Sequence, residues 1–277
     1  MKDRAYAKIN LSLNITGVRE DGYHTLESVF LPIDFFDELE IVKDKEMSYS
    51  CNNRFIRFNE ANTIVKAINL MKETYDIKDN FKVTLSKHIP MQAGLAGGST
   101  DASSVIRILN KMYNLNLTDE EARKLCYRIG ADVTFTYFSK PAYVSGVGEN
   151  IEPIEVKNQY YCLIAKPSRG VSTKICYETM NLETCPHPDI EKLVEALKNG
   201  DDVIPYLGNS MEPAAISLVS EIAELKNRII ELGGDFALMS GSGSSVFTLS
   251  RNRDLVKALS DTLRGEGYFT RYTKIRK

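Results

Sequence analysis

The stretch Ala93-Gly94-Leu95-Ala96-Gly97-Gly98-Ser99-Thr100-Asp101 decides how the surrounding chain folds. Before it, Phe81, Val83 and Leu85 alternate with polar residues, as a half-buried strand requires. After it, apolar residues recur at helical spacing between Ala102 and Met112. The stretch is therefore predicted to be a glycine-rich loop that runs into the N-terminus of a helix.

A loop of this kind suits a phosphate group. A helix N-terminus offers free backbone N–H groups and the positive end of the helix dipole, and glycines let the backbone approach a ligand closely. Ser99, Thr100 and Asp101 can cap the helix, and a hydroxyl there can also reach a metal ion. The alternative is an ordinary flexible loop that caps a helix. A P-loop NTPase and a Rossmann dehydrogenase are disfavoured, because no lysine follows the glycines and no G-x-G-x-x-G is present.

Composition indicates a globular protein with one large or two ordinary domains. The chain has 277 residues, of which 43% are hydrophobic and 26% charged. A net charge of −2 gives no bulk attraction to nucleic acid or to an anionic membrane. No apolar run is long enough to span a bilayer, and the N-terminus carries no signal-peptide core. The five cysteines lack C-x-x-C spacing and are interpreted as reduced thiols, so we expect a cytoplasmic location.

Residues 4–15 alternate without a break and are predicted to form a strand. Apolar side chains occupy one face, and the other face carries Lys8 and Asn10, two residues apart and pointing together. The alternative to a functional pair is the solvated face of an antiparallel sheet.

An Asp21-Gly22 turn follows this strand, and Tyr23 and His24 start the next one. An aromatic residue followed by histidine can stack on a flat ring and hydrogen-bond to its edge. Equally, Tyr23 can be a residue that favours strands and His24 a solvated imidazole.

Asp132 stands out in the middle of the chain. Thr118 to Glu121 form a capping box that opens a helix, and Gly130 is predicted to end it. Asp132 follows at once and leads into the strand-like residues 133–138. An acid beside such an apolar run is either a turn former or a catalyst.

The second half of the chain reads as a split βαβ layout in the order βαββαβ, with extra helices inserted after the first strand. The pattern of predicted strands and helices changes near residues 150–158. We therefore predict a domain boundary there, with domains 1–155 and 156–277. The predicted strands cover residues 160–165, 236–239, 246–249 and 268–273, and the predicted helices cover residues 189–198, 214–232 and 254–263.

Five motifs, taken in order, resemble the GHMP kinase superfamily. They are A-K-I-N-L at 7–11, D-G-Y-H at 21–24, the loop at 90–101, G-A-D-V at 130–133 and S-G-S-G at 240–243. The resemblance extends over nearly the whole chain. The glycine loop indicates only the superfamily, whereas A-K-I-N-L, D-G-Y-H and G-A-D-V resemble its branch in non-mevalonate isoprenoid biosynthesis.

The resemblance implies an α+β fold of two domains. The N-terminal domain would be like ribosomal protein S5 domain 2, and the C-terminal domain would be ferredoxin-like. It also implies an ATP-dependent kinase that uses Mg²⁺ and transfers the γ-phosphate to the 2-hydroxyl of 4-diphosphocytidyl-2-C-methyl-D-erythritol. This small molecule is the expected partner, with no nucleic acid and no membrane, in a monomer or homodimer.

The resemblance also assigns roles to residues. It makes Lys8 and Asp132 the catalytic pair, and Thr100 or Ser99 the metal ligand. The substrate would contact Asn10, Tyr23, His24, Val147, Thr173 and Tyr177. ATP would contact Asn62, Lys87, Pro90, Met91, Gln92, Ala93, Gly94, Leu95, Ala96, Gly97, Gly98, Ser99 and Thr100.

Several positions depart from the superfamily pattern, and they leave other interpretations open. Ala96 replaces a glycine and Thr100 a serine, Thr134 and Ser244 replace prolines, and Ser210 replaces an acid. A methyl group at position 96 forbids little unless φ is positive there. The alternatives are another superfamily kinase, acting on homoserine, mevalonate or a sugar, and a non-catalytic nucleotide-binding paralogue.

Overall fold

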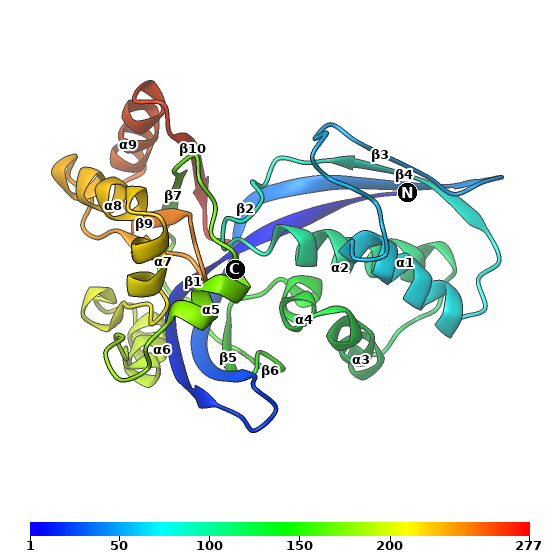
Figure 1. Ribbon diagram of the computed structural model, residues 1–277, viewed down its shortest axis with the longest axis horizontal. Coiled ribbons are helices and arrows are strands. Elements are labelled where there is room, and N and C mark those ends of the chain that lie inside the picture. Colours follow the sequence, from blue (N-terminus) through cyan, green and yellow to red (C-terminus); the bar gives the residue numbers. More distant parts are fainter. The chain divides into compact units, whose positions relative to one another are not determined.

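The computed structural model describes all residues from 1 to 277, which form two compact units that interleave along the chain (Figure 1). Two long strands, β1 (Lys2–Val18) and β2 (His24–Asp44), contribute residues to both units. The boundary after residue 155 rests on sequence alone and stays a prediction. Unit 1 comprises Met1–Ala7, Phe36–Pro90 and Ala96–Ser139, and unit 2 comprises Lys8–Phe35, Met91–Leu95 and Lys140–Lys277.

Unit 1 combines strands with a group of helices. The end of β2 pairs with the antiparallel strand β4 (Asn80–Ser86), and β4 pairs in parallel with β3 (Ser48–Cys51). The helices pack against one another, and Figure 1 shows them on one side of β2 to β4. They are α1 (Thr63–Thr74), α2 (Gly97–Met112), α3 (Asp119–Ile129) and α4 (Ala131–Phe138).

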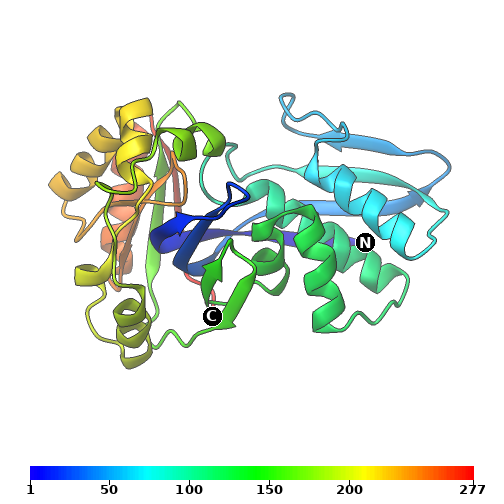
Figure 2. The ribbon, with the colours of Figure 1, turned by 60° about the horizontal axis from the view of Figure 1, so that its bottom comes forward.

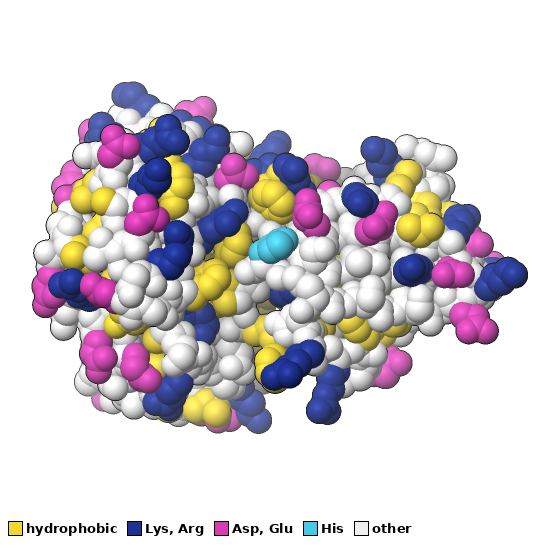
Figure 3. Space-filling view, turned by 90° about the horizontal axis from the view of Figure 1, so that it is seen from above, with side chains coloured by type: hydrophobic (Ala, Val, Ile, Leu, Met, Phe, Trp, Pro, Cys, Tyr) yellow, Lys and Arg dark blue, Asp and Glu magenta, His cyan; other side chains and the backbone are white.

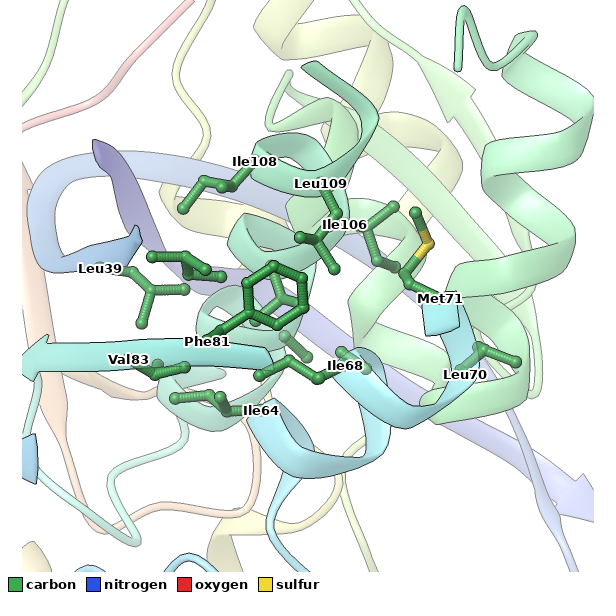
Figure 4. Close-up of a cluster of buried hydrophobic side chains, with 14 of the residues drawn as sticks. Leu39, Ile64, Ile68, Leu70, Met71, Phe81, Val83, Ile106, Ile108 and Leu109 are labelled. Carbon is green, nitrogen blue, oxygen red and sulfur yellow. The ribbon is translucent and has the colours of Figure 1, made fainter. Parts of the chain in front are cut away.

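Phe81 lies at the centre of the hydrophobic core of unit 1. Figure 4 shows its ring directed from β4 toward side chains of α1 and α2, including Ile64, Ile68 and Ile106. The alternation along β4 buries Phe81, Val83 and Leu85 and leaves the residues between them less buried. The prediction of a half-buried strand is therefore confirmed.

The helix after the glycine loop starts earlier than expected. α2 begins at Gly97, and its N-cap residue is Ala96, which forms no side-chain capping bond. The prediction that Ser99, Thr100 or Asp101 caps this helix is wrong, because all three lie inside it.

The capping box at Thr118 is confirmed, and Gly130 ends α3 as predicted. The strand predicted for residues 133–138 is wrong, because these residues belong to α4. Their β-branched and aromatic composition is overridden by packing, since α4 lies against α2 and α3 and buries four consecutive residues from Val133 to Thr136.

Unit 2 contains a second sheet. Its strands β7 (Tyr161–Lys166), β8 (Leu238–Met239), β9 (Val246–Ser250) and β10 (Phe269–Lys274) pair antiparallel in the order β10-β7-β9-β8. With α8 (Glu221–Glu231) and α9 (Arg253–Gly265) on one face (Figure 2), the order βαββαβ is confirmed. The inserted helices are α5 (Thr173–Thr179), α6 (Ile190–Asn199), the 3₁₀ turn η1 (Ile204–Tyr206) and α7 (Glu212–Leu218).

The single helix predicted over residues 214–232 is wrong, because the chain breaks between α7 and α8. Val219 has φ −143° and ψ 88°, which is not helical, and its side chain is buried in the core of unit 2. The carbonyl of Leu218 accepts a hydrogen bond from the Arg169 guanidinium at 3.2 Å. This external donor satisfies a carbonyl at the end of α7.

A further hairpin completes unit 2. Strand β5 (Ala142–Gly146) pairs with residues 26–30 of β2 on one edge and with β6 (Asn150–Pro153) on the other.

No helix in the structure has both the length and the apolar character that crossing a membrane requires. On the face drawn in Figure 3, basic and acidic side chains are interspersed, and neither sign gathers into a broad patch.

Candidate active site

The polar face of β1 is buried from Lys8 to Ser12, so the alternative of a solvated sheet face is wrong for these residues. The exposed fraction is 4% for Lys8, 2% for Asn10 and 0% for Ser12. Loop segments of unit 2 cover this face, since the Ser12 hydroxyl donates to Gly208 O at 2.8 Å. Buried polar groups require partners, and these residues have them.

Lys8 and Asn10 form a connected polar row within unit 2. The Lys8 ammonium donates to Asn10 Oδ1 at 2.6 Å and lies 4.2 Å from the centre of the Phe30 ring. Asn10 Nδ2 in turn donates to the Ser28 hydroxyl at 3.1 Å. The two side chains that the sequence places together are therefore in direct contact, and each is held in one orientation.

The two glycine-rich loops of the sequence touch each other closely. Gly94 has φ +69°, and a β-carbon added to it would lie 1.8 Å from the Ser240 carbonyl oxygen. No other amino acid fits at this position without moving the backbone. The Ser240 hydroxyl donates to Gly94 O at 2.9 Å and accepts from the backbone N–H of Asn10 at 3.2 Å.

Further backbone hydrogen bonds extend this contact along the loop. Ser244 N donates to Gln92 O at 3.2 Å, Ser245 N donates to Ala93 O at 3.3 Å, and Lys8 N donates to Leu95 O at 3.2 Å. In the sequence, S-G-S-G at 240–243 is only one of the motifs of the family resemblance, with no contact to the first loop predicted. The repeat of small residues in S-G-S-G was the available signal that another backbone approaches there.

The backbone of the first loop alternates in the sign of its φ angle. Its φ angle is positive at Gln92, Gly94 and Ala96 but not at the two residues between them. Such alternation turns successive N–H groups toward the same side of the chain and makes an anion-binding concavity. None of the N–H groups from Gln92 to Ser99 donates a hydrogen bond within the protein. Backbone donors without acceptors in such numbers are rare unless a ligand or water binds them.

The two hydroxyl groups suggested as metal ligands differ in their surroundings. The Thr100 hydroxyl donates to Tyr6 O at 2.8 Å, and the residue is fully buried. These contacts do not favour the metal role of Thr100, which stays a prediction. Ser99 is partly exposed in the first turn of α2, so its hydroxyl fits a phosphate or a metal ion better. The structure contains no cluster of three or more His, Cys, Asp or Glu side chains suited to a metal ion.

Lys87, expected near the nucleotide base, has a buried ammonium with two carboxylate partners. It lies 2.5 Å from Asp37 Oδ2 and 2.7 Å from Asp101 Oδ2. The other oxygen of Asp37 accepts hydrogen bonds from the backbone N–H groups of His88 and Ile89. A β-carbon on Gly97 would lie 2.9 Å from Lys87 Nζ, so this triad sits directly beneath the start of α2.

The triad contains two carboxylates for one ammonium, and this excess affects titration. Burial lowers the pKa of Lys87, but Asp101 and Asp37 outweigh this effect and raise it. Burial raises the pKa of Asp101 to about 7, although Lys87 opposes this. Asp101 Oδ1 is buried without a hydrogen-bond partner, which fits a carboxyl that is protonated over part of the neutral range.

Asp132 and Asn62 both lie at helix starts in unit 1. Asp132 is in the first turn of α4, where the helix dipole favours a negative charge. Asn62 caps α1, accepting from Ile64 N at 2.9 Å. Lys8 belongs to unit 2, and its pairing with Asp132 stays a prediction.

Two of the residues expected to bind a ring already touch. The rings of His24 and Tyr177 have centroids 4.5 Å apart and an interplanar angle of 30°. Burial lowers the pKa of His24, which keeps the imidazole neutral near pH 7. Tyr23 is 66% exposed and therefore available to stack on a ligand. Among the other predicted substrate residues, the Thr173 hydroxyl lies 2.8 Å from that of Ser242, and Val147 is half-buried in the turn between β5 and β6.

The departures from the superfamily pattern have structural explanations at several positions. The Ser210 hydroxyl donates to Pro186 O at 2.7 Å and accepts from Ile15 N at 3.0 Å. The Ser244 hydroxyl donates to Arg169 O at 2.6 Å. Ala96 adopts φ +57°, the left-handed conformation in which a methyl group is unfavourable.

Sequence comparison identifies the family. The family model described as GHMP kinases N terminal domain matches residues 62–140, and the model described as GHMP kinases C terminal matches residues 186–268. A protein of Bacillus subtilis (strain 168) named 4-diphosphocytidyl-2-C-methyl-D-erythritol kinase is 38% identical over 267 residues, covering 95% of this chain and 92% of the relative. This chain belongs to the GHMP kinase family.

Further relatives agree with this assignment. A Geobacillus protein (strain WCH70) of the same name is 38% identical over 266 residues, with the same shares covered. A crystal structure of 4-(cytidine 5'-diphospho)-2C-methyl-D-erythritol kinase has a TM-score of 0.85 and 30% identity, and each chain is fully covered. Homoserine kinase from Cytophaga hutchinsonii has a TM-score of 0.73 at 16% identity, with 98% of this chain and 94% of that chain covered, and shows the shared fold only. This GHMP kinase is an ATP-dependent small-molecule kinase with the two-part α+β fold that the sequence predicted.

We predict that Ala96→Gly stabilises this kinase. The left-handed conformation costs a residue with a β-carbon roughly 1–2 kcal/mol. Glycine loses about 0.4–1 kcal/mol through the greater freedom of the unfolded chain. The expected net gain of about 0.5–1 kcal/mol is measurable by urea unfolding. Ala61→Gly, at an exposed turn position without positive φ, is the control and should lower stability. A loss of stability in Ala96→Gly as well would contradict the assigned strain.

The titration of Asp101 gives a second prediction. Because its pKa is raised in the folded state, folding takes up a proton, and the contribution of Asp101 to wild-type stability should fall as the pH rises from about 4 toward 7. Asp101→Asn removes this group while Asp37 still balances Lys87. The unfolding free energy of the variant minus that of the wild type should therefore increase over this range, as measured in urea at successive pH values. A difference that decreases with pH would show that Lys87 keeps Asp101 ionised.

Proposed function

We propose that this kinase phosphorylates the 2-hydroxyl of 4-diphosphocytidyl-2-C-methyl-D-erythritol, with ATP as the phosphate donor. The observation that carries the proposal is the 38% identity, over 95% of the chain, to relatives that have this substrate in their name. The exposed Tyr23 and the neutral His24, side chains that can receive a flat ring, support it. Homoserine or mevalonate offers no ring for these residues to contact.

The first glycine loop is proposed to hold the phosphates of ATP. Its N–H groups from Gln92 to Ser99 have no acceptor in the protein, and the positive end of the α2 dipole adds to their attraction for an anion. Mg²⁺, when bound with ATP, supplies charge neutralisation at the phosphates. Of this chain's side chains, the Ser99 hydroxyl is the one that we assign to the metal or to a phosphate oxygen.

Lys8 and Asp132 are proposed to act on the acceptor hydroxyl and the transferred group. Phosphoryl transfer depends mainly on positioning and on stabilisation of negative charge. The contacts with Asn10 and with the Phe30 ring hold the Lys8 ammonium, and therefore its positive charge, in one position. Asp132, in the first turn of α4, accepts or orients the proton of the attacking hydroxyl.

The proposed substrate is tested by a panel of acceptors. ATP consumption should require the cytidyl-erythritol compound, and homoserine and mevalonate should give no turnover above background. Turnover with homoserine or mevalonate instead would leave a GHMP kinase with another acceptor. No turnover with any acceptor, combined with measurable ATP binding, would favour a non-catalytic paralogue.

Asp132→Asn should lower kcat by about 10²–10⁴-fold, the usual contribution of general acid–base help. ATP affinity should change little, because the carboxylate acts on the hydroxyl and not on the nucleotide. Asp119→Asn, which removes an exposed acid from the first turn of the neighbouring helix α3, is the matched control and should leave kcat unchanged. Retention of more than a tenth of wild-type kcat in Asp132→Asn would remove Asp132 from the mechanism.

Tyr23→Ala and His24→Ala should each raise KM for the cytidyl substrate and leave KM for ATP nearly unchanged. Stacking of a base on an aromatic side chain contributes about 1–3 kcal/mol, which corresponds to at least a fivefold change for Tyr23→Ala. Cytidine diphosphate should compete with the substrate in the wild type and less well in both variants. Tyr127→Ala, at a tyrosine of α3 that is 51% exposed, is the control. An unchanged substrate KM in Tyr23→Ala would refute the ring-binding role.

A further inference from the structure

A cavity of about 570 Å³ lies in unit 2, apart from the glycine loops. Three walls form it: the entry to β5 at Lys140 and Pro141, the chain from Pro153 to Lys157 after β6, and the end of α6 at Lys198. Lys277 completes the lining. Volumes of this size are typical of small-molecule sites.

Hydrogen bonds join the walls to one another, so the cavity is part of the fold. Ile154 N donates to Pro141 O at 3.0 Å, and Lys157 N donates to Leu197 O at 3.1 Å. Two of the lysine side chains are also fixed: Lys157 Nζ donates to Asn199 O at 2.8 Å, and Lys277 Nζ donates to Lys157 O at 2.8 Å. Each of these ammonium groups keeps two further donors for a ligand.

The charge of the lining is strongly unbalanced. Four exposed lysines line the cavity together with one acidic side chain, Glu155, although the whole chain has a net charge of −2. None of the four ammonium groups lies within 4.0 Å of a carboxylate, whereas Lys124 and Lys192, which are exposed in the same way, each have such a partner. Four unneutralised cations around one hollow attract a group with more than one negative charge.

The floor of the cavity is apolar. Pro141 and Val156 are buried, and Ile154 is half-buried. A ligand that satisfies both parts of the lining has a multiply charged anionic group next to an apolar portion. The lysine ammonium is a common partner of phosphate.

We propose that this lysine-lined cavity binds a small organic phosphate or diphosphate, with its anionic group at Lys140 and Lys198 and its apolar part on Ile154. The cavity lies at the open end of the β5–β6 hairpin, where Ala142 pairs with Pro153. Val147 is in the turn at the opposite end of the same hairpin. The site is therefore separate from the residues assigned to the kinase reaction and does not depend on the proposed substrate.

Hexyl phosphate and inorganic phosphate are suitable probes, and the full-length protein is titrated calorimetrically with saturating ADP present. ADP occupies the glycine loop, so that only a second site is measured. Hexyl phosphate should bind saturably with one equivalent per chain, more tightly than inorganic phosphate, and more weakly as salt is added. Absence of a saturable second site under these conditions would overturn the proposal.

Charge reversal and its control test the location. Lys140→Glu/Lys198→Glu should weaken hexyl phosphate binding by about tenfold or more, because two charge-assisted contacts become repulsive. Lys257→Glu reverses an exposed lysine of α9 that does not line the cavity and should change the affinity less than about twofold. Equal losses in both would show that binding is non-specific attraction to positive charge.

The variant Ile154→Ser tests the contribution of the apolar floor to binding separately from that of the lysines. It should reduce the preference for hexyl phosphate over inorganic phosphate and leave the affinity for inorganic phosphate unchanged. Circular dichroism of each variant confirms that it is folded, and kinase activity at saturating substrates should match the wild type. An undiminished preference for hexyl phosphate in Ile154→Ser would place the apolar part of the ligand elsewhere and refute the assigned binding mode.

Discussion

The approach of Gly94 to the carbonyl of Ser240 is the contact on which the arrangement of unit 2 depends. A β-carbon at Gly94 would overlap that oxygen, so the two loops meet backbone to backbone. The Ser240 hydroxyl then bonds to both Gly94 and Asn10. Through these bonds, the turn between β8 and β9 fixes part of the first glycine loop and the polar row of β1 at once. Three segments that are remote in sequence, around Asn10, Gly94 and Ser240, are thus held together by one small set of contacts.

Buried lysines also hold loops in place, one in unit 1 and one in unit 2. Lys87 is held by Asp37, whose other carboxylate oxygen accepts hydrogen bonds from the backbone N–H groups of His88 and Ile89. Lys166 is buried as well, but its ammonium donates to carbonyls of the turn that follows β7, among them Pro167 O at 3.0 Å and Arg169 O at 3.1 Å. Burial lowers the pKa of Lys166, whereas the carboxylates raise that of Lys87. The same residue type therefore orders one loop through acids and another through neutral carbonyls.

Sequence reasoning succeeded where local chemistry determines the outcome. The capping box at Thr118, the alternation around Phe81 and the order of elements in the second half all follow from short-range patterns. It failed where tertiary packing decides. Residues 133–138 have strand-forming side chains but become a helix between other helices.

The candidate site shows the same division. The sequence motifs pointed to Lys8, Asn10 and the glycine loop, but alternation along β1 could not reveal that its polar face is buried from Lys8 to Ser12. The cover comes from residues about two hundred positions away, such as Gly208 and Ser240. Likewise, nothing local shows that Ala96 is left-handed, because that conformation is imposed by the loop as a whole.

The interleaving of the two units has a consequence for synthesis on the ribosome. Every residue of unit 1 has been translated once Ser139 is added, whereas unit 2 needs the chain through its last strand. Leu13 forms an isolated β-bridge with Asn209, and Ile33 forms one with Ile275. The partners of these two early residues are therefore synthesised much later. The nascent chain therefore carries Leu13 and Ile33 without these partners for most of translation. Neither unit corresponds to a continuous piece of the coding sequence, and a simple truncation cannot separate one from the other.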